Sequence, residues 1–84
     1  VFEGPNIVIT TPENGSTFET SLVRISGVAS HIAFITLNDR QIFVDEKGNL
    51  NEELLLQKGH NIISIKATDR FNRRVEKRLE LIYQ

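Results

Sequence analysis

The stretch of sequence that decides the fold is NIISIKATD at residues 61–69, where apolar and polar side chains alternate. Isoleucine or alanine stands at positions 63, 65 and 67, and polar residues stand at positions 64, 66 and 68. A period of two over this length is typical of a β-strand with one buried face. We therefore predict a half-buried strand here, with Ile63 and Ile65 as central core residues.

Turn-forming residues divide the rest of the chain into similar short segments. They are Pro12-Glu13-Asn14-Gly15, Gly27, Asn38-Asp39, Lys47-Gly48-Asn49, Lys58-Gly59 and residues 69–73. Turn signals about every 8 to 12 residues are typical of an all-β sandwich or barrel. We predict seven strands, at residues 6–10, 22–27, 33–37, 41–45, 50–56, 61–68 and 75–83. Their inward-facing residues are expected to be Ile7, Ile9, Val23, Ile25, Ile35, Leu37, Ile42, Val44, Leu50, Leu54, Leu56, Ile63, Ile65, Ala67, Val75, Leu79, Leu81 and Tyr83.

The size and composition indicate one small domain at residues 1–84. The chain contains no cysteine, so apolar burial and strand hydrogen bonds must stabilise it without disulfides. Its 10 basic and 11 acidic residues give a net charge of -1, which argues against a nucleic-acid partner. No apolar run approaches the roughly 18 residues of a membrane span, so no membrane insertion is expected. The chain starts at Val1 without a signal peptide, and we expect a module excised from a longer multidomain protein.

The order and spacing of these segments are similar to those of a known family. The motifs are Thr11-Pro12-x-Asn14-Gly15, Val23-x-Ile25-Ser26-Gly27, Ile35-Thr36-Leu37-Asn38-Asp39, residues 42–50, residues 56–69 and Tyr83. They resemble the bacterial immunoglobulin-like domains of surface proteins and of accessory regions of secreted glycosidases. The glucodextranase domain B group is the nearest member, and the resemblance covers nearly the whole chain.

This resemblance implies a seven-stranded, antiparallel, immunoglobulin-like β-sandwich. It also implies an accessory module outside the bacterial cell, secreted or at the cell surface, and it carries over no catalytic residue. The chain departs from the family at Asn72, where the family's turn has glycine. Because asparagine tolerates the left-handed conformation better than other non-glycine residues, we expect the turn to survive.

No motif points to catalysis, so we predict no enzyme activity, no cofactor and no metal ligand. His31 and His60 have neither a second histidine nor a carboxylate at metal-ligand spacing. The turn DEKGN at residues 45–49 superficially resembles part of a calcium loop. Lys47 in its centre and the lack of a spaced Asp-x-Asp run favour ordinary turn chemistry, with a weak calcium site near Asp45 as the alternative.

Other polar residues have simple structural interpretations. Asn61 and Asp69 lie on the buried phase of their strand, and we expect their side chains to bond loop backbone at its two ends. Lys66 and Lys77 are the strand lysines that an intramolecular isopeptide bond could use. Lys77 shares the apolar phase of the last strand, and we favour a solvated lysine there. The basic residues near the C-terminus alternate with glutamates, which favours a charged edge strand over an anion-binding patch.

Some apolar residues fall on the phase that points away from the core: Val8, Phe34, Phe43, Leu55, Ile62 and Ile82. A two-residue turn at Asn38-Asp39 would make Phe34 and Phe43 cross-strand neighbours on an outer face. Scattered surface residues are the simplest interpretation. The alternative is a docking face with the two phenylalanines at its centre, and with Val8, Leu55 or Ile62 at its rim if their strands lie alongside.

The sequence therefore favours a non-catalytic spacer or adhesion module of a bacterial surface or secreted protein, monomeric in isolation. A carbohydrate-binding accessory domain of a glycoside-active enzyme is the alternative, although the chain has no tryptophan, one tyrosine and five phenylalanines. A protein-interaction module that adds a strand or docks an apolar face is a third interpretation. The expected partners are neighbouring domains of the same chain, or a protein or glycan ligand.

Overall fold

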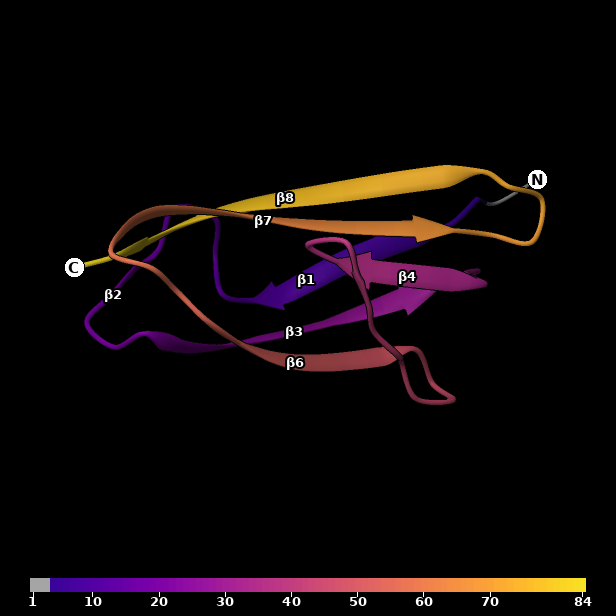
Figure 1. Cartoon of the computed structure of the whole chain (residues 1–84). Helices are drawn as coiled ribbons and strands as arrows, with labels where there is room; N and C mark the ends of the chain where they lie inside the picture. Colours follow the sequence, from indigo (N-terminus) through magenta and orange to yellow (C-terminus); the bar gives the residue numbers. More distant parts are fainter. Residues whose placement is uncertain (1–3) are drawn as a thin grey trace.

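The computed structural model describes residues 4–84, and these residues form eight β-strands. The strands are β1 (Asn6–Thr11), β2 (Thr17–Phe18), β3 (Leu22–Ser30), β4 (Phe34–Leu37), β5 (Arg40–Gln41), β6 (Asn49–Leu55), β7 (Gly59–Thr68) and β8 (Arg74–Tyr83). One sheet has the order β1-β3-β6, and the other has the order β2-β8-β7-β4-β5 (Figure 1). The predicted immunoglobulin-like sandwich is confirmed, with eight strands instead of seven. Among the described residues, no helix is long and apolar enough to cross a membrane.

The core lies between the two sheets and is built from the alternating residues of the long strands. Ile65 of β7 is 0% exposed and Ile63 is 1% exposed, so both are central as predicted. Every residue of the predicted inward phase is buried or half-buried. The structure adds Ala29, Phe18 and Ile32, which also pack in or against the core. Ala29 was missed because the predicted strand ended too early.

Gly27 is not a turn residue, as the sequence had suggested, but lies inside β3. It pairs with Ile9 of β1, next to a β-bulge between Ile9 and Thr11. A Cβ atom on Gly27 would overlap the carbonyl oxygen of Val8. Glycine is therefore required at this position because the backbones of β1 and β3 approach too closely for a side chain.

The predicted strand at residues 41–45 is largely wrong. Only Arg40–Gln41 pair with β4, and one further backbone bond joins the Ile42 N–H to the Ile35 carbonyl at 3.1 Å. Beyond this point the chain crosses to the other sheet to begin β6, so it cannot stay paired with β4. The additional strand β2 has two residues, which is too short for any periodic pattern, and it pairs in parallel with β8.

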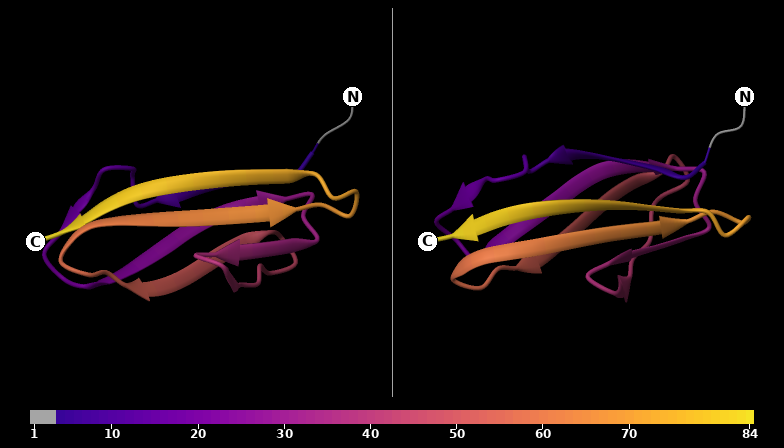
Figure 2. Two further views of the ribbon diagram at one scale, coloured as in Figure 1. Left: turned by 45° about the horizontal axis from the view of Figure 1, so that its top comes forward. Right: turned by 90° about the horizontal axis from the view of Figure 1, so that it is seen from above.

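The sandwich is elongated, with principal extents of 43 × 22 × 20 Å. β7 and β8 run along its length, and residues 4–5 lie at the end opposite Gln84 (Figures 1 and 2). The C-terminal end of β8 is held by β2, since the N–H of Ile82 bonds the Ser16 carbonyl at 2.9 Å. The N–H of Gln84 bonds the Phe18 carbonyl at 3.0 Å. The last described residue is thus anchored at one pole of the molecule.

Candidate functional site

The five residues of the proposed docking face are all exposed, but the structure divides them between two faces. Val8 and Leu55 lie on β1 and β6, in the three-stranded sheet. Phe34 and Ile62 lie on β4 and β7, in the five-stranded sheet, and Phe43 follows β5. Val8 and Leu55 therefore cannot border a patch centred on the phenylalanines. The docking role of Phe34 and Phe43 stays a prediction.

The hairpin that carries the two phenylalanines has the predicted register. Leu37 pairs with Arg40 across a turn in which Asn38 and Asp39 both have positive φ angles, 50° and 68°. Phe34 is 47% exposed and Phe43 is 73% exposed, so both rings point away from the core. The β4–β5 ladder ends before it reaches them. Direct contact between the rings also stays a prediction.

Asp69, at the end of β7, is the one buried charged residue in the described part of the chain, at 7% exposure. Its Oδ1 atom accepts hydrogen bonds from the backbone N–H groups of Phe71 and Arg73, at 2.9 and 2.8 Å. Its Oδ2 atom accepts from Nε of Arg73 at 2.6 Å. Burial acts to raise the pKa of Asp69, but these hydrogen bonds and the Arg73 charge outweigh it, so the pKa lies below its ordinary value.

Asp45 has the same place in the turn between β5 and β6 as Asp69 has in the turn between β7 and β8. Its Oδ1 atom accepts from the N–H groups of Lys47 and Asn49, and Oδ2 accepts from the Asn49 side-chain amide at 3.1 Å. The bonds from Asn49 hold the pKa of Asp45 below its ordinary value. Both carboxylate oxygens thus serve the turn itself. Among residues 4–84, no three His, Asp or Glu side chains form a group that could hold a metal ion.

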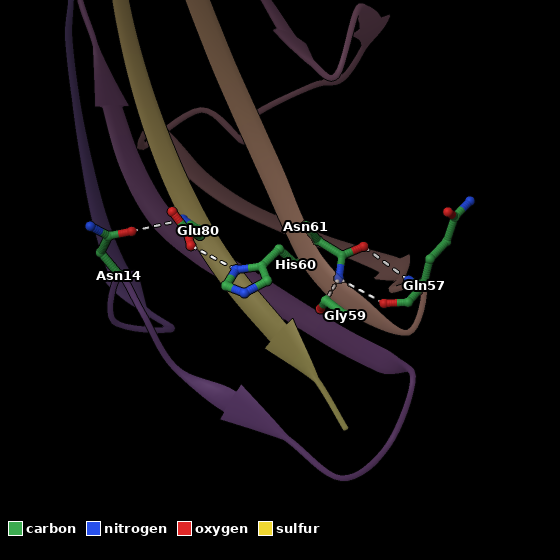
Figure 3. Close-up of polar contacts among 6 residues, drawn as sticks. All are labelled: Asn14, Gln57, Gly59, His60, Asn61 and Glu80. Atoms are coloured by element: carbon green, nitrogen blue, oxygen red, sulfur yellow. Dashed lines mark hydrogen bonds and ion pairs between the residues drawn. The ribbon is translucent and has the colours of Figure 1, made fainter.

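A polar network surrounds the opposite end of the sandwich (Figure 3). The Asn61 side chain accepts from the Gln57 N–H at 2.9 Å and donates to the Gln57 carbonyl at 2.8 Å. This confirms that Asn61 and Asp69 fix the turns at the two ends of β7. Nδ1 of His60 lies 2.8 Å from Oε1 of Glu80, and the Glu80 N–H donates to Oδ1 of Asn14 at 2.7 Å. These contacts tie β7, β8 and the segment before β2 together.

The turn between β7 and β8 presents the aromatic ring of Phe71, which the sequence places beside the basic residues considered as an anion-binding patch. The exposed ring of Phe71 has two guanidinium groups over it, with its centroid 5.0 Å from Cζ of Arg70 and 5.5 Å from Cζ of Arg73. Such cation–π contacts hold the ring in a defined orientation. The signal available in the sequence was the Arg-Phe-x-Arg spacing inside a five-residue turn.

The two strand lysines do not support an isopeptide bond, because both side chains are exposed. Lys66 lies 3.7 Å from the Asp39 carboxylate on the outer face of the five-stranded sheet. Lys77 is on the inward phase of β8, yet it is exposed at the side of the sandwich. A buried lysine beside a buried partner is therefore missing at both positions.

Comparison with protein families gives one result that covers the whole sandwich. The family described as glucodextranase, domain B, matches residues 5–83. The chain belongs to the glucodextranase domain B family. This is a family of immunoglobulin-like accessory domains. No curated protein matches the chain.

The departure of this glucodextranase domain B member at Asn72 does not change its turn. Asn72 has a φ of 68°, and the corresponding residue of the other aspartate turn, Gly48, has a φ of 88°. The N–H of each bonds the carbonyl of its aspartate, at 3.0 and 2.9 Å. Asparagine therefore fills the left-handed position that glycine fills elsewhere in the same chain.

Proposed function

We propose that this domain is a non-catalytic accessory module that holds its neighbours apart in a secreted or cell-surface bacterial protein. The observation that carries the proposal is the position of residues 4–5 and Gln84 at opposite poles of a body 43 Å long. Segments attached at the two ends would be separated by the length of the sandwich. Membership of an accessory-domain family supports the same role.

The contacts within the domain suit a rigid spacer. Hydrogen bonds to β2 anchor the end of β8, and side-chain bonds from Asn61 and Asp69 fix the turns at both ends of β7. Three side chains that could have served in catalysis instead bond to neighbouring parts of the fold: Asp45, Asp69 and His60. Their chemistry is used to maintain shape, which favours a structural role over catalysis.

The spacer role is tested by replacing the module inside the protein that carries it. One version receives an unrelated immunoglobulin-like sandwich of similar length, and another receives a flexible Gly/Ser linker of about 16 residues, with an r.m.s. length near 22 Å. Small-angle X-ray scattering measures the separation of the neighbours. We expect the unrelated sandwich to preserve both the separation of the neighbouring domains and the activity of the protein that carries them. We expect the flexible linker to reduce both. Loss of activity with the unrelated sandwich would show that a specific surface is required.

A carbohydrate-binding role is the second candidate, and the exposed phenylalanine rings favour it. Phe71 and Phe43 are both exposed, and Phe71 is oriented by its two arginines. Aromatic faces are the usual platform for sugar rings, although tryptophan and tyrosine are more common in that role. Titration of the isolated domain with dextran oligosaccharides, followed by NMR, separates the two functions. Shifts confined to Phe71 and Arg70 that disappear in Phe71→Ala would establish binding, whereas no shift at millimolar sugar supports the spacer.

The absence of catalysis is tested on the isolated domain as well. We expect background rates on a panel of polysaccharides and esters. The Ser64 hydroxyl donates to Oε2 of Glu76 at 2.7 Å, but the same oxygen accepts from Nε of Arg78 at 2.9 Å, and these bonds lower the pKa of Glu76 and make it a weak base. A rate above background that survives repurification would contradict the proposal.

A further inference from the structure

One edge of the five-stranded sheet is open along most of β8. β2 occupies this edge only opposite Ile82 and Tyr83, and the Gly15 N–H bonds the Glu80 carbonyl at 2.7 Å. From Arg74 to Leu79, β8 pairs with β7 on its inner side, and no strand of the described chain pairs with its outer side. The pairing with β2 demonstrates that this edge accepts a strand, and it leaves about six residues vacant.

The vacant part of the edge presents unpaired backbone groups. In an antiparallel ladder both backbone groups of a residue point to the same side, and successive residues alternate. Glu80 and Ile82 bond outward, toward the segment that leads into β2. By the same alternation, Glu76 and Arg78 present their N–H and C=O groups to the open side. An unpaired row of this kind is a template for another strand.

β1 of the other sheet approaches β8 without pairing to it (Figure 2). A groove lies between β1 and this edge. Its volume is about 410 Å³, and its walls include Ile7, Ile9, Lys77 and Leu79. Pro12, Glu13 and Asn14 close it at the β2 end. The groove therefore has apolar and polar lining residues, backbone donors and acceptors along one side, and Lys77 in its wall. Arg78 is a second cation of the lining, and it is paired with Glu76 at 2.9 Å.

Lys77 is the unusual residue in this groove. It stands between Val75 and Leu79 on the phase of β8 that faces the core, and its ammonium group makes no hydrogen bond or ion pair with residues 4–84. The open edge of the other sheet has a charge in a similar place, Glu52 of β6, between Leu50 and Leu54. That carboxylate is paired with Nη2 of Arg40 at 3.4 Å. Lys77 and Glu52 thus both carry a charge on the core-facing side of an edge strand. Glu52 has an ion-pair partner, whereas the ammonium group of Lys77 has none within residues 4–84.

We propose that the open edge of β8 binds an extended polypeptide segment that carries an acidic side chain opposite Lys77. Paired residues of neighbouring strands share one face of a sheet, so the residue opposite Lys77 would point into the groove beside it. The residues two positions before and after it would face Val75 and Leu79, and these positions favour apolar side chains. The segment recognised is therefore apolar–x–acidic–x–apolar. Strand addition of this type uses backbone bonds for affinity and alternate side chains for specificity.

Lys77 also determines what the edge rejects. A segment with an apolar residue at the central position would desolvate the ammonium group without pairing it, which is costly. A second copy of β8 aligned on the same position would place two lysines together, and like charges directly opposite destabilise a strand pair. The edge is thus open to an acidic strand and closed to its own duplicate.

The proposal is tested with two capped seven-residue peptides on the wild-type domain. Each has valine at the second and sixth positions and threonine elsewhere, with glutamate at the centre of one and lysine at the centre of the other. In low salt we expect the glutamate peptide to shift the amide signals of Glu76 and Arg78 and to slow their hydrogen exchange. The lysine peptide should bind about tenfold more weakly or not at all. Equal binding, or binding that leaves these two amides unchanged, would overturn the proposal.

A charge reversal supplies the second measurement. Lys77→Glu should exchange the preference, so that the lysine peptide binds better than the glutamate peptide. Lys47→Glu in the β5–β6 turn makes the same change in net charge away from the groove and should keep the wild-type preference. Reversal in both variants would show that only net charge matters, which would contradict the assignment to this edge.

If Lys77→Glu does not fold, as judged by its melting curve, the two peptides on the wild-type domain still decide the question. The result is independent of the spacer role. A domain that binds neither peptide overturns the acidic-strand site and leaves the proposed function intact.

Discussion

Asp45 and Asp69 occupy the same position in two separate turns that have the same pattern of backbone hydrogen bonds. In each turn, Oδ1 of the aspartate accepts from the N–H groups two and four residues later, at 2.8 to 2.9 Å. The turns differ at Oδ2, which accepts from an asparagine amide in the first and from the Arg73 guanidinium in the second. One chain thus contains two versions of the same aspartate turn, one with a neutral partner at Oδ2 and one with a cationic partner.

This difference predicts unequal effects of the same substitution. Asparagine keeps an oxygen that can accept both backbone bonds, but it cannot form an ion pair with Arg73. Asp69→Asn should therefore lower the melting temperature clearly more than Asp45→Asn, which serves as its matched control. Equal losses, measured by circular dichroism at pH 7, would show that the guanidinium contact adds nothing to the turn.

The low pKa of Asp69 predicts a loss of stability in acid. Its ordinary value is 3.8, and in the folded domain it is lower. The unfolded chain therefore binds a proton more readily, so this contribution is complete above pH 3.8 and is lost as the pH falls through the folded pKa. Asp45 and Glu76 have lowered pKa values as well and act in the same direction. Urea titrations between pH 2 and 6 should show a smaller pH dependence in Asp69→Asn than in the wild type.

The turn between β4 and β5 predicts opposite effects for two glycine substitutions. Asp39 has a φ of 68°, so Asp39→Gly removes strain and should stabilise the domain by up to about 1 kcal/mol. Asn38 also has a positive φ, but its Oδ1 atom accepts the Ser64 N–H at 2.8 Å. Asn38→Gly loses that bond and should cost about 1 kcal/mol. Changes of the same sign in chemical denaturation would contradict this assignment.

The position of Ile65 predicts the largest loss among the substitutions considered. Its side chain is 0% exposed at the centre of β7, and truncation to alanine should cost about 2–5 kcal/mol. A domain this small has only about 5 kcal/mol in total, so a loss near the upper end of that range would leave much of the variant unfolded at 37 °C. Ile62→Ala on the exposed face of the same strand is the control, and it should change the unfolding free energy by no more than about 0.5 kcal/mol.

The close approach at Gly27 predicts that even a methyl group is harmful there. Gly27→Ala would press Cβ against the Val8 carbonyl, and separating β1 from β3 should cost about 1–3 kcal/mol. Gly4→Ala is the comparison, because its nearest neighbours are side-chain atoms of Arg73 at 3.9 Å. A melting temperature for Gly27→Ala equal to that of the wild type would mean that the bulge absorbs the change.

The features predicted correctly from the sequence are those that a single strand determines. The alternation in β7 and β8 identified the buried residues, because parity fixes which side chains share a face. The roles of Asn61 and Asp69 followed from their place at strand ends. The Asn38-Asp39 turn followed from the need for two positive φ angles.

The features missed from the sequence depend on contacts between distant segments. Gly27 looked like a turn residue because nothing in the local sequence indicates that β1 pairs closely beside it. Parity placed Val8 and Leu55 outward, but it could not show that their strands belong to the other sheet from Phe34. The groove beside Lys77 was equally hidden, since it is formed by strands at opposite ends of the chain.

The placement of the two described ends has a mechanical consequence. A pulling force applied at residues 4–5 and Gln84 acts along the strands, so the ten paired positions of β7 and β8 are loaded in shear. Bonds loaded in shear must break together, whereas a hairpin pulled apart from one end opens one bond at a time. The chain enters through β1 and leaves through β8, which belong to different sheets. Tension therefore slides one sheet over the other, and the interlocked apolar layer between them resists the extension.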